Sequence, residues 1–198
     1  MKLFYTKRSP YARKVRIIAM EKKIDLELME EDLTKKTDNL VLDNPIGRIP
    51  TLELDDGRVL CDSTLIGEYL NSLNDGLKLL PQDSAEQLKV KNIDFVAKGL
   101  IDVTVGLFYE KFKHPQNFHQ GYVKNQEETI KRTLKYFNDN IGMLKEFNMA
   151  AVNVICAVGY IKFRAPHLWA DSEYSKLKDW FDRHQARTSV KDTVPQNG

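Results

Sequence analysis

A serine at the start of an expected helix is the first residue in this sequence that could do chemistry. Ser9 stands directly before Pro10 and an apolar pattern with helical spacing, which is typical of a helix N-cap followed by a first-turn proline. A hydroxyl at that place can stabilise an anion, such as a thiolate, through one hydrogen bond and the helix dipole. Alternatively, Ser9 only caps the helix by accepting a hydrogen bond from a backbone amide. One hydroxyl can serve in both ways.

Three nearby side chains are alternatives to Ser9. Tyr5 ends an apolar run, so core packing is its expected role, and Tyr11 offers another hydroxyl in the same segment. Arg13 could lower the pKa of a thiol by its charge. An arginine in the first turns of a helix is more often solvated or part of a dimer interface, so we rank Arg13 below Ser9.

The cysteines and histidines point to neither disulfides nor a metal. Two cysteines, Cys61 and Cys156, are too few for a disulfide framework and have apolar neighbours, so we expect both to be reduced and buried. Among the four histidines, His114 and His119 flank a short loop, but no cysteine or carboxylate joins them at ligand spacing. We therefore expect no metal.

The elements that must position Ser9 have an α/β order over the first 75 residues. Alternation and short apolar runs predict strands, and apolar residues spaced by threes and fours predict helices. Asp55-Asp56-Gly57 predicts a tight turn between two antiparallel strands. The expected elements are strand 2–5, a helix from Pro10, strand 25–30, a weaker helix 33–42, strands 51–54 and 59–61, and a helix capped by Asp62, Ser63 and Thr64.

The rest of the chain predicts a helical bundle. Helical spacing runs through Ile93 to Leu107 and through Ile130 to Leu144. The apolar segment 149–160, with Asn148 as N-cap, is short enough for a central buried helix, and a last amphipathic helix is expected over 172–184. We therefore predict two domains, 1–75 and 84–198, with the linker at 76–83.

Charge and composition exclude several classes of protein. The 30 basic and 28 acidic side chains of this 198-residue chain give a net charge of +2 and are interspersed, which does not indicate a nucleic-acid partner. No apolar run approaches the length of a membrane span. The first residues lack the apolar stretch of a secretory signal, so we expect a cytoplasmic protein.

Four segments, in this order, resemble the glutathione transferase superfamily, most closely its small bacterial members. They are Ser9 to Val15, Asn44 to Leu52, Asp62 to Leu70 and, more weakly, Asn148 to Tyr160 with Trp180 to Ser189. The resemblance samples nearly the whole chain. It implies a thioredoxin-like N-terminal domain, a helical C-terminal domain of the glutathione transferase type and a homodimer.

The resemblance also implies a glutathione site. Ser9 would assist the thiolate, and the backbone of Ile49, before a cis Pro50, would pair with the cysteinyl part, although a trans proline at a strand start is the ordinary reading of Ile49-Pro50. Asp62 would meet the γ-glutamyl ammonium and Ser63 its carboxylate, while both also cap their helix. The glycyl carboxylate needs a cation, for which the candidates are Arg48, Lys35 and Lys36.

The second substrate would lie in an apolar pocket lined by Tyr11, Phe108, Tyr109 and Phe112, unless the last three are core residues. The resemblance implies glutathione transferase activity with a role in detoxification. The glutathione thiolate would attack an electrophile or a peroxide, with glutathione as co-substrate. The alternative is a non-catalytic binding or regulatory protein of the stringent starvation protein type, because this fold also hosts relatives without activity.

The sequence departs from the family pattern at the expected buried helix. Relatives usually have serine or threonine as its cap and an aspartate three residues on, which together form a reciprocal capping box. This chain has Asn148 and Ala151. Asparagine caps well, but the alanine side chain cannot accept a hydrogen bond from the backbone amide of the cap residue. We therefore expect this helix to lack one interaction, which is worth ~1 kcal/mol.

Overall fold

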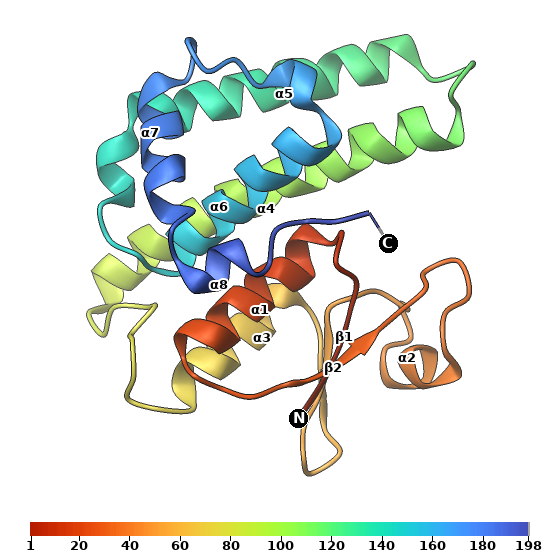
Figure 1. Ribbon diagram of the computed structural model, residues 1–198, viewed down its shortest axis with the longest axis vertical. Coiled ribbons are helices and arrows are strands. Elements are labelled where there is room, and N and C mark those ends of the chain that lie inside the picture. The colour runs from red at the N-terminus through yellow and green to blue at the C-terminus, as the bar shows by residue number, and fades with distance from the viewer. Residues whose placement is uncertain (198) are drawn as a thin grey trace. The chain divides into compact units, whose positions relative to one another are not determined.

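The computed structural model describes residues 1–197, which form two compact units (Figure 1). The first contains Met1–Leu80 together with residues 188–197, and the second contains Pro81–Arg187. The sequence placed the last residues in the helical domain. In the structure they return to the first unit, because the short helix α8 (Thr188–Lys191) packs on α1 (Pro10–Glu21).

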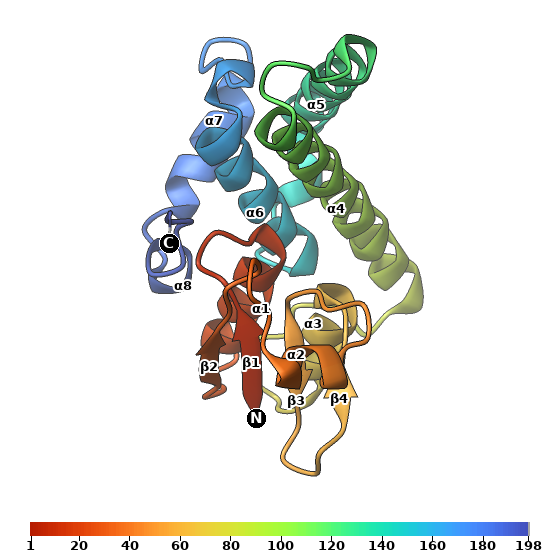
Figure 2. The same cartoon turned by 90° about the vertical axis from the view of Figure 1, so that its right-hand side faces the viewer.

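The first unit is built on a four-stranded sheet in the order β2-β1-β3-β4 (Figure 2). The strands are β1 (Lys2–Tyr5), β2 (Glu27–Glu30), β3 (Thr51–Glu53) and β4 (Val59–Leu60). β1 pairs with β2 in parallel, and β3 is antiparallel to both β1 and β4. Leu3 and Leu52, paired across β1 and β3, are fully buried. This is the predicted thioredoxin-like arrangement.

Helices α1, α2 (Asp38–Asp43) and α3 (Ser63–Ser72) complete this unit. α2 begins five residues later than the predicted helix, which started at Leu33. The delay has a local cause: the Asp32 carboxylate accepts a hydrogen bond from the Thr34 amide at 2.9 Å, which holds a turn in place of a helix. Thr37 then caps α2 by accepting from the Leu40 amide at 3.3 Å.

The second unit is helical, as predicted. Its helices are α4 (Ser84–Lys113), α5 (Gln120–Asp139), α6 (Met149–Arg164) and α7 (Ser175–His184), with short 3-10 helices η1 (Ile141–Leu144) and η2 (Pro166–Leu168). α6 is the buried centre and extends four residues beyond the predicted end. Asn148 caps it by accepting from the Ala151 amide at 3.1 Å. The predicted cap is confirmed, and Ala151 offers no side-chain acceptor in return.

His184, at the end of α7, is partly buried beside aromatic rings, and burial favours its neutral form. Its ring stacks on Phe147 at 5.6 Å and lies 4.5 Å from the ring of Trp180. Burial lowers the pKa of His184, and the nearby Arg187 and Arg183 lower it further, against a hydrogen bond to the Trp180 carbonyl that raises it. The unfolded chain, in which histidine titrates near 6.5, therefore binds a proton at a higher pH than the folded chain.

We therefore expect an acid-dependent loss of stability that is due to His184. The contribution of neutral His184 to the free energy of unfolding is complete above about pH 6.5, which is the pKa in the unfolded chain. It is lost as the pH falls through the lower pKa of the folded chain. Chemical unfolding between pH 8 and pH 5 should show this slope in the native chain and a weaker slope in His184→Phe. His114→Gln, at an exposed histidine, is the matched control; an equal slope in His184→Phe and the native chain would contradict the assignment.

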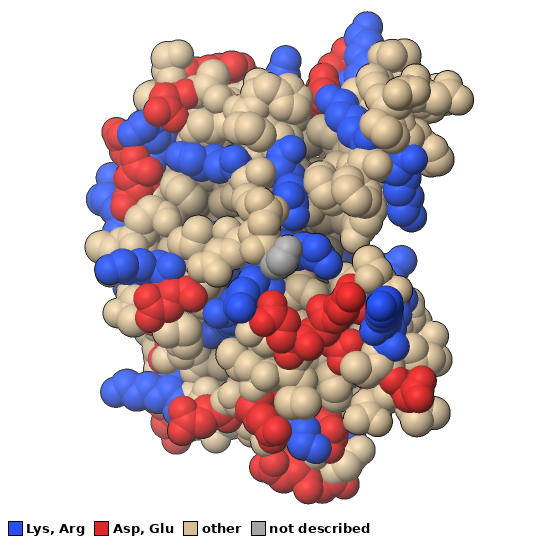
Figure 3. Space-filling view, turned by 45° about the vertical axis from the view of Figure 1, so that its right-hand side comes forward, with Lys and Arg blue, Asp and Glu red and all other residues tan. Residues whose placement is uncertain are grey.

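Basic and acidic side chains lie among one another on the face drawn in Figure 3. Ion pairs along a helix join Lys135 to Asp139 at 2.8 Å and Lys178 to Asp182 at 2.7 Å. Within residues 1–197, every helix is too short or too polar to cross a membrane.

Candidate functional site

Three segments meet at one edge of the sheet. β1 leads out of the sheet toward Ser9, β4 leads out toward Asp62, and β3 is entered through Pro50. The register pairs Phe4 with Thr51 and Leu52 with Leu60. Because β3 is antiparallel to both neighbours, its first residue lies beside the last residues of β1 and β4. The sheet therefore brings the three predicted binding segments to the same edge.

Ser9 is the N-cap of α1, with Pro10 at the first helical position. Its hydroxyl oxygen accepts a hydrogen bond from the Ala12 amide at 3.2 Å, and its own amide donates to the Thr6 carbonyl at 3.2 Å. The side chain acts here as an acceptor, so the hydroxyl proton can still be donated. The predicted cap is confirmed, and its geometry is compatible with donation to a thiolate.

The loop before β3 is held by its own polar side chains. The side-chain amide of Asn44 donates to the Arg48 carbonyl at 2.9 Å and to the Thr51 hydroxyl at 3.0 Å. The Thr51 hydroxyl in turn donates to the Arg48 carbonyl at 2.8 Å. Gly47 has a φ of +60°, the left-handed region that favours glycine. Sequence reasoning missed Asn44 and Thr51 as supports of this loop, although Asn-Pro is a turn signal.

The peptide bond between Ile49 and Pro50 is cis, as the resemblance implied. Within residues 1–197, no hydrogen bond joins the Ile49 backbone to another part of the chain. Because Ile49 stands two positions before β3, its amide and carbonyl suit a strand-like pairing with a peptide ligand. The cysteinyl part of glutathione is a ligand of that kind.

Asp62 and Ser63 form the start of α3. Asp62 is the N-cap, and its carboxylate accepts from the Thr64 amide at 2.9 Å and from the Leu65 amide at 3.4 Å. Ser63 is the first helical residue and is buried. Its amide belongs to the first turn, whose N–H groups have no acceptor inside the helix. Such a place suits the carboxylate of a ligand, while Asp62 supplies the opposite charge for an ammonium group.

Lys36 is the cation that lies against the loop before β3. Its ammonium nitrogen is 3.1 Å from the point that a Cβ on Gly47 would occupy. Arg48 is exposed, and so is Lys35. Lys36 is exposed as well, and the structure places its ammonium against Gly47, whereas sequence reasoning put Arg48 first among the three cations.

The neighbouring alternatives differ in their outcome. Tyr5 is buried in the core, as expected, and the Arg16 guanidinium lies 5.1 Å from its ring centre. Arg13 is only 1% exposed, so the expectation that it is solvated or at a dimer interface was wrong. The expectation for Cys61 was also wrong: it is partly exposed, with its sulfur 3.8 Å from the Thr51 hydroxyl. Cys156 is buried, as predicted.

The aromatic residues predicted for a second-substrate pocket are divided between the units. Tyr11 is half-buried on α1 in the first unit. Phe108, Tyr109 and Phe112 lie together on α4, with the Phe108 ring 5.6 Å from Tyr109 and 5.5 Å from Phe112. Tyr109 is 41% exposed and Phe112 is 67% exposed, so neither is a core residue. The α4 aromatics therefore form a partly solvent-facing cluster in the second unit.

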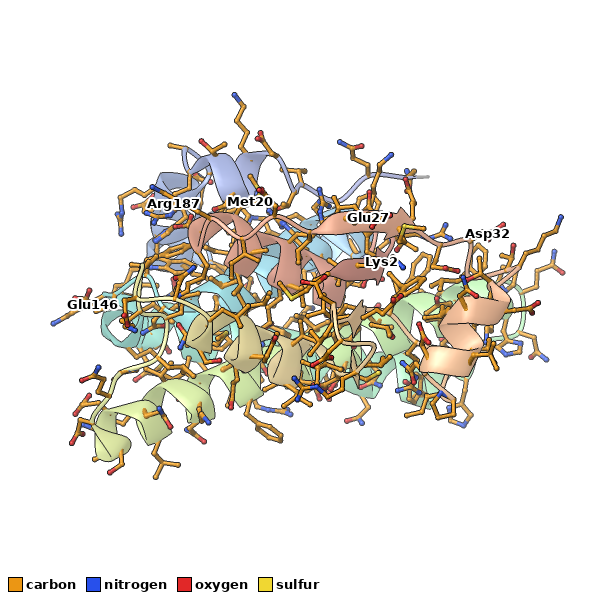
Figure 4. The ribbon with its side chains drawn as sticks, turned by 90° about the horizontal axis from the view of Figure 1, so that it is seen from below. Lys2, Met20, Glu27, Asp32, Glu146 and Arg187 are labelled. Carbon is orange, nitrogen blue, oxygen red and sulfur yellow. The ribbon has the colours of Figure 1, made fainter. Side chains whose placement is uncertain are left out.

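A cavity of about 310 Å³ lies at the opposite edge of the sheet. Figure 4 shows two of its lining residues, Lys2 and Glu27, on neighbouring strands. Its charged groups pair with one another: the Lys2 ammonium lies 3.2 Å from Glu53, and the Met1 amine lies 2.6 Å from Asp55. Glu53 raises the pKa of Lys2 by this hydrogen bond and by its charge. The cavity contains none of the predicted site residues, so we do not place the site there.

Candidate metal-ligating side chains are not clustered in residues 1–197. Within them, no group of three or more histidine, cysteine, aspartate or glutamate side chains is arranged to hold a metal ion.

Comparison with known proteins finds one family in both sequence and fold. Residues 3–78 match the family model described as glutathione S-transferase, N-terminal domain. An Escherichia coli K12 protein named uncharacterized GST-like protein YibF is 33% identical over 169 residues, which cover 83% of each chain.

Two solved structures match over nearly the whole chain. One is a glutathione S-transferase from Methylobacillus flagellatus KT with glutathione bound, which is 32% identical with a TM-score of 0.94 and covers 98% of this chain and 99% of that chain. The other is a glutathione transferase family member from Pseudomonas fluorescens Pf-5 with bound glutathione. It is 31% identical with a TM-score of 0.91 and covers 99% of each chain.

Proposed function

Because this chain belongs to the glutathione transferase superfamily, we propose that it binds glutathione as a co-substrate and promotes attack of the glutathione thiolate on an electrophile or a peroxide. The observation that supports this most is the full-length match to two structures that hold glutathione. The convergence of the Ser9, Pro50 and Asp62 segments at one sheet edge supports it independently.

Binding would use three kinds of group on this chain. The Ile49 backbone would pair with the cysteinyl part, and the Ser63 amide and hydroxyl would meet the γ-glutamyl carboxylate at the start of α3. Asp62 would meet the ammonium group. For the glycyl carboxylate the candidates are Arg48, which directly precedes Ile49, and Lys36, whose ammonium lies against Gly47 of the same loop.

The chemical step would depend on Ser9. A free thiol with a pKa near 8.5 is mostly protonated at neutral pH, so a thiolate must be stabilised. Donation from the Ser9 hydroxyl, at the positive end of α1, would stabilise the sulfur anion. In conjugation, the sulfur forms a bond to an electrophilic carbon, and the leaving group departs with the electron pair. With a peroxide, the sulfur forms a bond to one peroxide oxygen while the O–O bond breaks, and the other oxygen leaves as an alkoxide that takes up a proton. The resulting sulfenic acid of glutathione then reacts with a second glutathione to give glutathione disulfide and water.

The exposed aromatics of α4 would contact an apolar second substrate. Phe108, Tyr109 and Phe112 present adjacent rings, and the Arg164 guanidinium lies 4.5 Å from the Phe108 ring centre. Aromatic faces with a cation beside them suit an aromatic electrophile. These three side chains are our candidates for contacts to the second substrate within the second unit, and Tyr11 is the candidate within the first.

We further propose a homodimer in the cytoplasm. Leu88 and Phe95 are 70% and 72% exposed, and their separation of seven residues places them on one face of α4. Large exposed apolar side chains on one face are typical of a surface that another chain covers. Both cysteines are free, which fits a reducing compartment. A role in detoxification would follow from the reaction.

The proposal is tested by two measurements on the full chain. Isothermal titration with glutathione measures binding, and a rate assay with a general aromatic electrophile or an organic peroxide measures turnover. We expect both binding and glutathione-dependent turnover. Binding without turnover would favour a non-catalytic binding protein, and absence of binding would overturn the proposed function while leaving the family assignment intact.

A further inference from the structure

The last residues of the chain are built into the unit that carries the candidate site. After the second unit ends at Arg187, the chain returns, and α8 packs on α1 (Figure 1). Three residues of this returning segment are almost fully buried: Ser189, Val190 and Thr193. Residues 188–197, which we call the C-terminal segment, therefore contribute to the core of the first unit.

Polar contacts join the C-terminal segment to α1 along its length. The Arg13 guanidinium donates to the Val190 carbonyl at 3.1 Å and to the Thr193 hydroxyl at 3.4 Å. At the other end of α1, the Ser189 hydroxyl donates to the Glu21 carboxylate. The last carbonyls of a helix such as α8 receive no hydrogen bond from an amide of the same helix. A guanidinium is a favourable donor to them.

Arg13 connects these contacts directly to Ser9. Its backbone amide donates to the Ser9 carbonyl at 3.0 Å, which is the first hydrogen bond of α1. The next bond in the same turn runs from the Ala12 amide to the Ser9 hydroxyl at 3.2 Å. A shift of Arg13 therefore moves the turn that fixes the Ser9 hydroxyl. The side chain of Arg13 thus donates to the C-terminal segment, and its backbone amide donates to the residue that caps α1.

We propose that the C-terminal segment is a positioning element for the thiol site, acting through Arg13 on the first turn of α1. This inference rests on the proposed function of Ser9, and it assigns a role to residues outside the binding site. The Thr193 hydroxyl is the side-chain group of the segment that accepts from the Arg13 guanidinium. It also donates to the Ser189 carbonyl at 2.7 Å, so a control variant must lose a similar donation. Neither Thr193 nor Arg13 touches the substrate in this scheme.

The test compares Thr193→Val, which removes the hydroxyl but keeps the shape, with Thr193→Ser, which restores it. Thr104→Val is the matched control, because Thr104 is a buried helical threonine in the second unit whose hydroxyl donates to a backbone carbonyl. The readouts are the pKa of the bound glutathione thiol, from the ultraviolet signal of the thiolate, and the rate with a general electrophile. A chain ending at Arg187 is compared with one ending at Pro195.

We expect Thr193→Val to raise the thiol pKa toward its free value and to slow turnover by roughly tenfold, since small misplacements of reacting groups lower rates by up to about 100-fold. Thr193→Ser and Thr104→Val should match the native chain. The chain ending at Arg187 should show the larger loss. An unchanged thiol pKa and rate in Thr193→Val would overturn the proposal, even if the shortened chain failed to fold.

A failure of the proposed function is distinguishable from a failure of this inference. If the native chain binds no glutathione, hydrogen exchange at the Ala12 and Arg13 amides decides the question. Faster exchange in Thr193→Val than in Thr104→Val would support a positioning role on α1. Equal exchange in the two variants would overturn it.

Discussion

Replacing Ser9 by alanine is expected to lower the rate of glutathione conjugation by about 100- to 1,000-fold, the usual effect of removing one donor that stabilises a developing anion. The pKa of the bound thiol should rise at the same time, because the sulfur anion loses its hydrogen bond. Affinity for glutathione should change little, since Ile49 and Ser63 are untouched. Steady-state rates and a spectroscopic titration of the bound thiol measure these effects.

The difficulty with Ser9→Ala is that it also removes the cap of α1, where the hydroxyl accepts from the Ala12 amide. Ser9→Gly separates the two roles, because glycine at an N-cap costs only a few tenths of a kcal/mol against about 1 kcal/mol for alanine. Donation to the thiolate predicts equal loss of rate in both variants, and Ser9→Thr should retain activity. Turnover near the native level in Ser9→Gly would show that Ser9 is only a cap.

Replacing Ser63 by alanine is expected to weaken glutathione binding by about 10- to 100-fold. A hydrogen bond to a charged group contributes roughly 1.5–3 kcal/mol, and each 1.4 kcal/mol is a factor of ten in Kd. The backbone amide of Ser63 remains, so some binding should persist. Isothermal titration calorimetry of the variant against the native chain gives the ratio of the two Kd values.

Ser72→Ala is the matched control for this change, because Ser72 ends the same helix and its exposed hydroxyl donates only to the Tyr69 carbonyl. Asp62→Asn tests the other half of the pair: asparagine keeps the cap of α3 but removes the charge that would attract the ammonium group. It should also weaken binding. Equal affinities in Ser63→Ala and Ser72→Ala would mean that the ligand carboxylate lies elsewhere.

The local chemistry of the candidate site was readable from the sequence. Helices begin at Ser9-Pro10 and at Asp62-Ser63. In each case the side chain of the first residue accepts a hydrogen bond from a backbone amide two or three residues later. Such signals require no partner from a distant part of the chain, so they survive in the fold as predicted. The bounds of β1 and the start of α6 followed in the same way from short patterns in the sequence.

Other features depended on contacts between distant residues, and sequence patterns did not identify them. Arg13 has the pattern of a solvated helical residue, yet it is buried because Val190, 177 positions later, supplies its acceptor. Phe112 has the pattern of a core aromatic, yet it is 67% exposed. Burial is decided by what packs on a helix face, and neither the periodicity of that helix nor its residue types specify the partner.

The sequence by itself determined the family and the caps of α1 and α3, and it supplied the residues that we propose for the thiol, the carboxylate and the ammonium group. Only the tertiary structure decided that the three segments share one sheet edge, that Lys36 lies against Gly47 and that residues 188–197 belong to the first unit. The physical reason is the range of the interactions: capping acts within one helical turn, whereas strand register and the return of a terminal segment are set by packing across the whole unit.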